Sequence, residues 1–337
     1  MISIKDVARH AGVAVGTVSN VINRPETVSA DVRARVTAVI HELGYVRSES
    51  ARHLRAGHSR MMGLLVLDMG NPFFVDVARG AERAARAAGL GVTLCNSGQD
   101  PAEEALYLSL FAEQRVRGVL ITPADANGAN LAAFRRHRIP YVLVDRVSPD
   151  EQSCSVSVDD VAGGGLALQH LVRAGHQQIA YISGPFSLAQ CRDRLAGARG
   201  VIAEAGLPES ALTVLEAEQM TVAAGRDGGS RLLGLAHRPT AVFCVNDLVA
   251  LGVLQAMFTA GVRVPRDMSI VGYDDIEFAA GAAVPLTSVR QPAFRMGQTA
   301  AQLLMEETGE AARSHSHQRV VFQPELVVRG STLVAHA

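Results

Sequence analysis

The sequence predicts a small all-α head followed by an α/β core of two doubly wound parallel-sheet subdomains. At 337 residues the chain is longer than one hydrophobic core usually organises, which favours several folding units. From Ile4 to Tyr45 the apolar spacing is helical throughout. From Met62 onward short apolar runs alternate with amphipathic helical segments, and this alternation is typical of parallel sheets covered by helices on both faces.

Three short helices account for the head. The first is predicted from Asp6 to Gly12, where the glycine ends it, and the second from Val15 to Asn23. The third is predicted from Ser29 to Leu43, with Ser29 as a favourable N-cap.

Within the head, Ala8, Gly12 and Val18 have the spacing of a helix-turn-helix. The small residue lets two helices approach, the glycine permits a tight turn, and the buried aliphatic side chain fixes the second helix. Residues 1–60 also carry nine basic and five acidic side chains, although the whole chain has a formal net charge of −1. Basic charge gathered at one end, around this spacing, predicts DNA binding.

The second helix is expected to read the DNA. An asparagine can bond an adenine edge with both of its polar groups, and a valine can contact a thymine methyl. Other polar residues are better placed for phosphates, although Thr17 and Ser19 could instead only cap and solvate the helix. The base-facing set is Val15, Gly16 and Asn20, the phosphate-facing set is Thr17, Ser19 and Arg24, and Lys5 completes the DNA-binding residues predicted for the head.

The remainder of the chain divides into a linker and two subdomains. Residues 47–60 are polar and basic and are expected to form a linker with one short helix. Strands are predicted at Gly63–Leu67, Gly91–Cys95, Gly118–Thr122, Tyr141–Val144, Ile179–Ser183, Ala241–Val245 and Ser269–Gly272. The predicted domains are the head at 1–46, the linker at 47–60, the N-terminal subdomain at 61–160 with 291–323, and the C-terminal subdomain at 161–290 with 324–337.

Several enzyme and transport classes are disfavoured. Lys5 is the only lysine, so no phosphate-loop or Schiff-base lysine follows it. No export signal or membrane span is visible, and the four cysteines are far apart, which predicts reduced thiols in a cytoplasmic protein without metal or cofactor. His315 and His317 are interpreted as solvated loop residues rather than metal ligands, and Gly163–Gly165 as close helix packing rather than a phosphate cradle.

Polar residues follow two of the predicted strands directly. Asn246-Asp247 and Asp274-Asp275 stand at such strand ends, where ligands of parallel α/β sheets bind. Their carboxylates and amides can bond the hydroxyls of a sugar-like ligand, and Arg192 and Arg194 could complete the set. The alternative is that each of these residues is only a helix cap or a surface charge.

Short sequence motifs spread over the chain together form a pattern that is specific to one protein family. They are Ile4–Ala8, Ala11–Val13, Thr17–Asn23, Val28-Ser29, Leu43–Tyr45, Asn71–Phe74, Val144–Arg146, Val158-Asp159, Gly175-His176, Ile182–Gly184, Asn246-Asp247, Val271–Asp275, Pro285–Val289 and Arg329–Thr332. With them, essentially the whole chain resembles the lactose-repressor/galactose-repressor family of transcriptional regulators. The resemblance implies a homodimeric, sequence-specific operator-binding regulator of repressor type, with a periplasmic-binding-protein-like core and a small polar effector between its subdomains.

The resemblance also implies a role for the linker. In that family it folds into a hinge helix on DNA, and a leucine from each subunit wedges into the minor groove. Leu54 occupies that place here, preceded by Ala51 and Arg52. The family usually has Pro-Asn where this chain has Arg47-Ser48, so initiation of the hinge helix is expected to rely on Ser48. The alternative is that Leu54 packs against its own core.

For the effector, the resemblance adds residues from both subdomains. Phe74 would stack on an apolar ring face, unless Phe73 and Phe74 are simple core residues. Met220 stands where many relatives have an aromatic residue, which weakens the case for a ring held between two aromatic side chains. A sugar is the first interpretation of the effector, and a nucleoside or other polyol-like metabolite the second. The predicted effector-binding residues are Phe73, Phe74, Asp145, Arg194, Met220, Asn246 and Asp274.

Two rival classes are a periplasmic-type sugar-binding receptor and a sugar-processing enzyme. The receptor would need an export signal and would not carry a basic head. The enzyme would need a nucleophile or an acid–base pair, and the carboxylates of the cleft suit ligand bonding equally well. The predicted partners are therefore double-stranded operator DNA, a small effector and a second copy of the chain, with no membrane.

Overall fold

The computed structural model describes residues 2–46, 59–125, 128–149, 152–309, 312 and 314–333. They belong to two units, the head (Met1–Ser59) and the core (Arg60–Ala337). The linker predictions for Ala51, Arg52, Leu54 and Arg47-Ser48 lie outside the described residues.

The head is a three-helix unit. It consists of α1 (Ile4–Ala11), α2 (Val15–Asn23), a short 3-10 turn (Pro25–Thr27) and α3 (Ala30–Glu42). Its core is built from small and branched side chains, namely Val7, Ala8, Ala11, Val18, Val21, Val36 and Val39.

The ends of the head helices follow their local sequence. Ser3 and Asp6 form a capping box at the start of α1, and Gly12 ends that helix with a φ of +63°. This φ is why the turn of the helix-turn-helix favours glycine, as its spacing predicts. Ser29 does precede α3, but its side chain makes no capping hydrogen bond, so the N-cap prediction is correct in position and wrong in mechanism.

The core contains two six-stranded sheets with the same pattern of strand order. The N-lobe sheet runs β11-β5-β4-β3-β1-β2 and the C-lobe sheet runs β12-β10-β9-β8-β6-β7. The described strands pair in parallel except β12, which is antiparallel to β10. The N-lobe strands are β1 (Met61–Val66), β2 (Gly91–Asn96), β3 (Val119–Ile121), β4 (Tyr141–Val144), β5 (Cys154–Val158) and β11 (Arg319–Phe322). The C-lobe strands are β6 (Ile179–Ser183), β7 (Leu212–Glu216), β8 (Ala241–Cys244), β9 (Ser269–Asp274), β10 (Thr287–Arg290) and β12 (Glu325–Val327).

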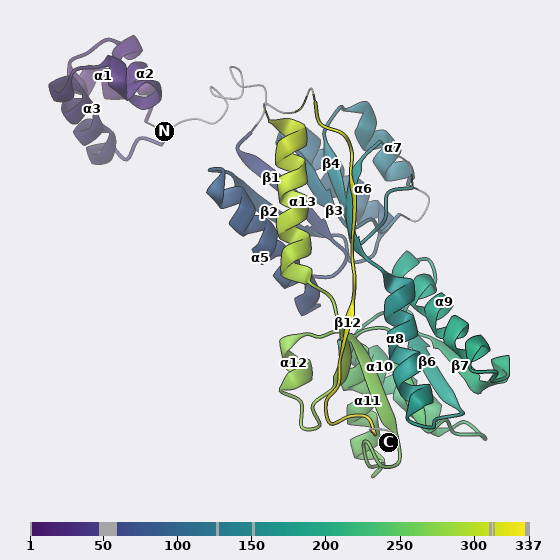
Figure 1. Cartoon of the computed structure of the whole chain (residues 1–337). Coiled ribbons are helices and arrows are strands. Elements are labelled where there is room, and N and C mark those ends of the chain that lie inside the picture. Colours follow the sequence, from purple (N-terminus) through teal and green to yellow (C-terminus); the bar gives the residue numbers. More distant parts are fainter. Residues whose placement is uncertain are drawn as a thin grey trace. The chain divides into compact units, whose positions relative to one another are not determined.

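Helices cover these sheets (Figure 1), which confirms the predicted fold class. The chain passes between the lobes after β5, after β10 and after β11, so each lobe is assembled from distant segments. None of the described helices combines the length and apolar character needed to cross a membrane. The N-lobe helices are α5 (Pro72–Ala87), α6 (Pro101–Glu113), α7 (Ala129–Arg136) and α13 (Ala293–Thr308). The C-lobe helices are α8 (Asp160–Arg173), α9 (Ala189–Glu204), α10 (Val222–Leu233), α11 (Asp247–Thr259), α12 (Glu277–Ala280) and a 3-10 turn (Glu209–Ala211).

Reciprocal glycines let three helix pairs touch backbone to backbone. In the pair α5 and α13, an added Cβ on Gly80 would lie 2.0 Å from the carbonyl oxygen of Phe294, and one on Gly297 would lie 1.9 Å from that of Val77. The pairs α8 with α9 and α10 with α11 repeat this arrangement at Gly164, Gly197, Gly225 and Gly252. Gly164 thereby confirms that the glycine run of α8 serves close helix packing.

Replacing Gly297 by alanine is expected to destabilise the core by about 1–3 kcal/mol or more, because the methyl group overlaps the backbone of α5. Chemical denaturation of the full chain measures this loss. The matched control is Gly200→Ala in α9, where an added Cβ meets nothing within 4 Å, so the variant should be as stable as the parent or more stable by up to about 1 kcal/mol. Equal stability of the two variants would contradict the overlap.

Candidate functional site

In the head, α2 presents an exposed face and a buried face. Val18 and Val21 are buried against the other helices, whereas Val15, Gly16 and Asn20 are exposed. No side chain caps the start of α2 at Ala14. The N-terminal end of a helix carries a partial positive charge and backbone N–H donors, which suits contact with a phosphate backbone.

The remaining predicted DNA contacts differ in how accessible they are. Lys5 and Arg24 are exposed, and Thr17 and Ser19 are half-buried. Ser19 Oγ accepts a hydrogen bond from Asn23 Nδ2 at 3.2 Å. Because the N-cap position of α2 is Ala14, neither Thr17 nor Ser19 caps the helix, so the capping part of that alternative is wrong.

In the core, a small cavity of about 20 Å³ lies where strand ends of the two lobes meet. All seven residues that the sequence assigns to the effector line it. The sequence did not identify the other three lining residues, Asn71, Gln190 and Gln291. The only local signal for two of them is their position after a strand, since Asn71 follows β1 and Gln291 follows β10.

Asp274 ties the two lobes together at this cavity. Its Oδ2 accepts a hydrogen bond of 3.0 Å from Asn71 Nδ2, and its Oδ1 accepts one of 2.7 Å from Gln291 Nε2. Asn71 is held in turn as the N-cap of α5, where its Oδ1 accepts from the Phe73 N–H at 3.0 Å. Asp274 has a φ of +103°, a conformation that costs about 1–3 kcal/mol and that surrounding contacts must maintain.

Arg194 is the buried cation of the site. Its Nε donates to Asp160 Oδ1 at 2.7 Å, its Nη1 donates to the carbonyl oxygen of Val245 at 2.6 Å, and its guanidinium lies 3.6 Å from the ring centre of Tyr273. The Tyr273 hydroxyl donates to the same Asp160 oxygen at 3.0 Å. Burial alone would lower the pKa of Arg194, but Asp160 and its neighbours raise it well above the usual value. At least two of the five N–H donors of Arg194 are therefore used within the C-lobe.

Asn246 and Met220 form part of the C-lobe wall of the cavity. Asn246 caps α11, because its Oδ1 accepts from the Val249 N–H at 2.9 Å. Its Nδ2 donates to the Met220 carbonyl oxygen at 3.1 Å. The helix-cap alternative is thus correct for Asn246, although the residue also lines the cavity.

Asp247 and Arg192, which the sequence also suggested as ligand contacts, do not line this cavity. Asp247 is buried and accepts hydrogen bonds from the Ser288 hydroxyl at 2.7 Å and from the Ile276 N–H at 2.9 Å. The Arg192 side chain donates to the carbonyl oxygens of Phe186 and Ser187. The prediction that Arg192 completes the effector set with Arg194 is wrong, because α9 already begins at Ala189 and directs Arg192 to the preceding loop.

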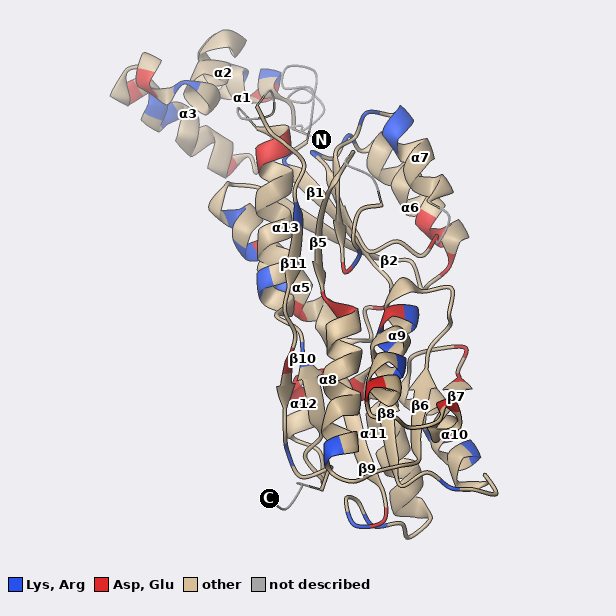
Figure 2. Ribbon diagram, turned by 45° about the vertical axis from the view of Figure 1, so that its right-hand side comes forward, with Lys and Arg blue, Asp and Glu red and all other residues tan. Residues whose placement is uncertain are grey.

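Buried acidic groups surround Arg194. Figure 2 shows acidic residues at the start of α8, where the lobes meet. Burial raises the pKa of Asp145 well above its ordinary value, nearby Asp160 and Asp274 raise it further, and Arg194 opposes the rise. Burial likewise raises the pKa of Asp274. The charge of Arg194 and the hydrogen bonds from Asn71 and Gln291 lower this pKa and so oppose the rise.

Two hydrogen-bond acceptors in the cavity wall have no donor among the described residues. Within the described part of the chain, Asp145 Oδ1 and Gln291 Oε1 are buried without a hydrogen-bond partner. Leaving such groups buried and unpaired costs about 1–3 kcal/mol each. A ligand that donates hydrogen bonds would remove this cost.

Phe73 and Phe74 supply the aromatic wall. Their rings are 5.0 Å apart in an edge-to-face arrangement with an interplanar angle of 74°. Both belong to the main hydrophobic cluster and both line the cavity. The core interpretation and the ligand interpretation are therefore compatible.

Comparison with known proteins identifies the family. The model of "Bacterial regulatory proteins, lacI family" matches residues 3–48, and that of "Periplasmic binding protein-like domain" matches residues 168–332. An "HTH-type transcriptional repressor PurR" from Photobacterium profundum is 35% identical over 334 residues, which cover 98% of each chain. The chain belongs to the LacI family.

Solved structures of LacI-family regulators agree with this assignment. A transcriptional regulator CelR–cellobiose complex has 32% identity and a TM-score of 0.73, and the match covers 98% of this chain and 100% of that one. The Lac repressor dimer bound to operator and the anti-inducer ONPF has 28% identity and a TM-score of 0.84 over 99% of both chains. The prediction of an effector-controlled, DNA-binding transcriptional repressor rather than an enzyme is confirmed by these relatives.

The buried carboxyl of Asp145 predicts a pH-dependent stability for this LacI-family repressor. A carboxyl whose pKa is raised in the folded state binds more protons there than in the unfolded state, so the free energy of unfolding falls as the pH rises above the ordinary value of 3.8. Asp145→Asn removes this penalty. The variant should gain stability relative to the parent between about pH 4 and pH 8 in thermal denaturation. A stability difference that stays constant over this range would contradict the prediction.

Proposed function

We propose that this LacI-family repressor binds its operator as a homodimer, and that a small polar metabolite between the two lobes controls its affinity. The proposal rests on the cavity between the lobes. Its lining includes Phe73, Phe74 and Asp145 of the N-lobe and Arg194 and Asp274 of the C-lobe. Ligands of parallel α/β sheets bind beyond the carboxyl ends of the strands, and here two such edges face the same space.

Control of DNA affinity is proposed to act through the contact between the lobes. A cavity of about 20 Å³ is far below the roughly 300 Å³ of a typical ligand pocket. Binding must therefore separate the cavity walls. This separation breaks the hydrogen bond between Asn71 and Asp274 that joins the walls. A ligand with different affinities for the two lobe arrangements shifts their populations, which is the thermodynamic requirement for an effector.

The chemistry of the wall favours a ligand rich in hydrogen-bond donors. Asp145, Asp274 and Gln291 offer carbonyl or carboxylate oxygens, and Phe73 and Phe74 offer apolar ring surface. A sugar combines hydroxyl donors with apolar ring faces, and the similar CelR structure holds cellobiose. A nucleoside is the second candidate, because the same two aromatic rings suit a planar base.

DNA recognition is proposed to lie with α2, where Val15, Gly16 and Asn20 face base edges. Phosphate contacts are assigned to Thr17, Ser19 and Arg24, and the minor-groove wedge to Leu54 of the linker. Lys5 of the head and Ala51 and Arg52 of the linker complete the proposed DNA-binding residues. The homodimer is supported by the similar Lac repressor structure, which is a dimer bound to operator. The head at 1–46, the linker at 47–60 and a cytoplasmic location are retained as predictions.

Asn20→Ala tests base recognition. It should weaken binding to the specific operator by about 1–3 kcal/mol per half-site, and it should leave binding to random duplex nearly unchanged. The comparison variant is Arg24→Ala, which should weaken binding to both DNAs and reduce the dependence of binding on salt. Fluorescence anisotropy on an operator isolated by selection measures both variants. If Asn20→Ala loses the same factor on both DNAs, α2 does not read the bases through Asn20.

Asp274→Asn tests the effector cavity. A panel of sugars, polyols and nucleosides is first screened on the full chain by thermal shift, because a ligand at about 100 times its Kd stabilises the folded state by about 2.7 kcal/mol. Asp274→Asn should lose most of that shift for the ligand found. The exposed Asp227→Asn variant in α10 is the control and should keep it. A full shift in Asp274→Asn would remove Asp274 from the effector site.

A further inference from the structure

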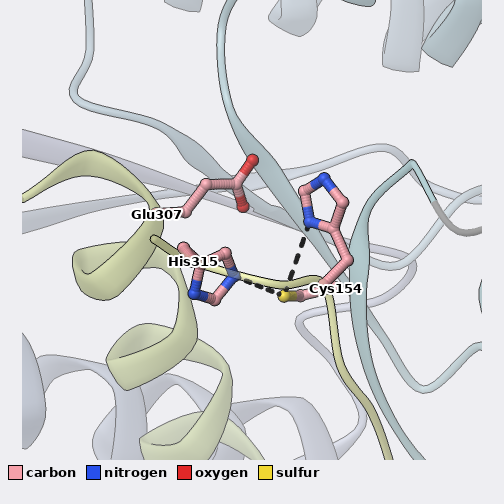
Figure 3. A group of neighbouring side chains, drawn as sticks. Cys154, Glu307 and His315 are labelled. Carbon is pink, nitrogen blue, oxygen red and sulfur yellow. Dashed lines mark hydrogen bonds between the residues drawn. The ribbon is translucent and has the colours of Figure 1, made fainter. Parts of the chain in front are cut away.

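Four side chains with metal-ligating atoms converge on one place in the N-lobe (Figure 3). Cys154 is the first residue of β5, Glu307 lies in the last turn of α13, and His315 and His317 precede β11. One ligand atom from each residue lies within 4.8 Å of those of the other three. Segments that are far apart in the chain therefore supply one thiol, one carboxyl and two imidazoles to a single space.

The Cys154 sulfur is the centre of this group. It lies 3.1 Å from His315 Nε2 and 3.8 Å from His317 Nδ1, and it accepts a hydrogen bond from the Gln318 N–H at 3.3 Å. The His315 side chain is only 5% exposed. The interpretation of His315 as a solvated loop residue is wrong, because its side chain contacts Cys154 of β5 and, at 3.6 Å, Glu306 of α13. His317 is exposed as expected.

Within this group the Glu307 carboxyl is poorly satisfied. Glu307 Oε2 is buried and has no hydrogen-bond partner among the described residues. Burial raises the pKa of the Glu307 carboxyl to about 7 and also raises the pKa of the Cys154 thiol. The Cys154 thiol can donate to one of the two neighbouring ring nitrogens, and the other can donate to the sulfur when it carries the ring proton.

We propose that Cys154, Glu307, His315 and His317 bind one zinc ion. Zinc prefers four ligands in a tetrahedron and accepts sulfur, imidazole nitrogen and carboxylate oxygen. In such a site the sulfur and a ring nitrogen are about 3.6 Å apart, which lies between the two observed distances of 3.1 Å and 3.8 Å. Calcium and magnesium are disfavoured because they require oxygen ligands.

Binding would displace the thiol proton to solvent and leave a thiolate on the ion. The ion would then fasten the C-terminal end of α13 to the β5–β11 edge of the sheet. The same helix packs along α5, and Gln291 just before it lines the effector cavity, so zinc would stiffen a layer that borders that cavity.

The test uses the full chain, stripped with a chelator and reloaded with Zn²⁺ or Co²⁺. The expected results are one zinc ion per chain by elemental analysis, a higher Tm with zinc, and a thiolate-to-cobalt charge-transfer band with Co²⁺. Cys154→Ser should abolish the band, and His317→Ala should weaken zinc binding by at least roughly tenfold. His317 is exposed, so this variant still tests the site if Cys154→Ser fails to fold.

Two matched variants serve as controls. Cys95→Ser changes another free cysteine and His237→Ala another exposed histidine, and both should retain the charge-transfer band and the affinity for zinc. The proposal is overturned if the stripped chain takes up no stoichiometric zinc. It is also overturned if the cobalt complex lacks a thiolate band, or if His317→Ala binds zinc as tightly as His237→Ala.

Discussion

The buried guanidinium of Arg194 is the interaction on which the centre of the core depends. Asp145, Asp160 and Asp274 approach one another where the two sheets meet, and burial disfavours the charged form of Asp145 and Asp274. Arg194 offsets this repulsion through its ion pair with Asp160 and its contact with Tyr273. Buried ion pairs of this kind contribute little net stability, but loss of one partner costs about 3–5 kcal/mol. The arrangement therefore serves the position of the carboxylates more than the stability of the fold.

Arg194 is one cation among several carboxyl groups. The cavity wall therefore offers fewer hydrogen-bond donors than its acceptors can use. Asp145 and Gln291 keep unused acceptors there, while Asp274 holds a strained backbone conformation through contacts that join the two lobes. Groups with strongly perturbed pKa values cluster at functional sites. These features reduce the stability of the ligand-free protein, and a ligand rich in hydrogen-bond donors would remove their cost.

The location of the cavity follows from the repeated architecture. Both sheets have the same order, and in each the direction in which successive strands are added reverses beside the first strand, β1 in the N-lobe and β6 in the C-lobe. Such reversal points leave a crevice at the carboxyl ends of the strands. The glycine crossings of α5 with α13 and of α8 with α9 bring the helices close enough to fix the ends of the elements that line it.

The sequence alone determined the elements and the edge at which the site lies. Each of the seven predicted strands is present with ends within two residues, because periodicity is a local property. The seven predicted effector residues share one cavity. The strand ends indicate Asn246 and Asp274, whereas Phe74, Asp145 and Met220 are inferred from the family resemblance. Tertiary structure alone decided that Arg194 pairs with Asp160, that Asn71 reaches Asp274, and that the short apolar edge strand β11 pairs with β5. It also brought His315 to Cys154. These contacts join residues far apart in the chain, and their partners are selected by packing between segments, which no local pattern records.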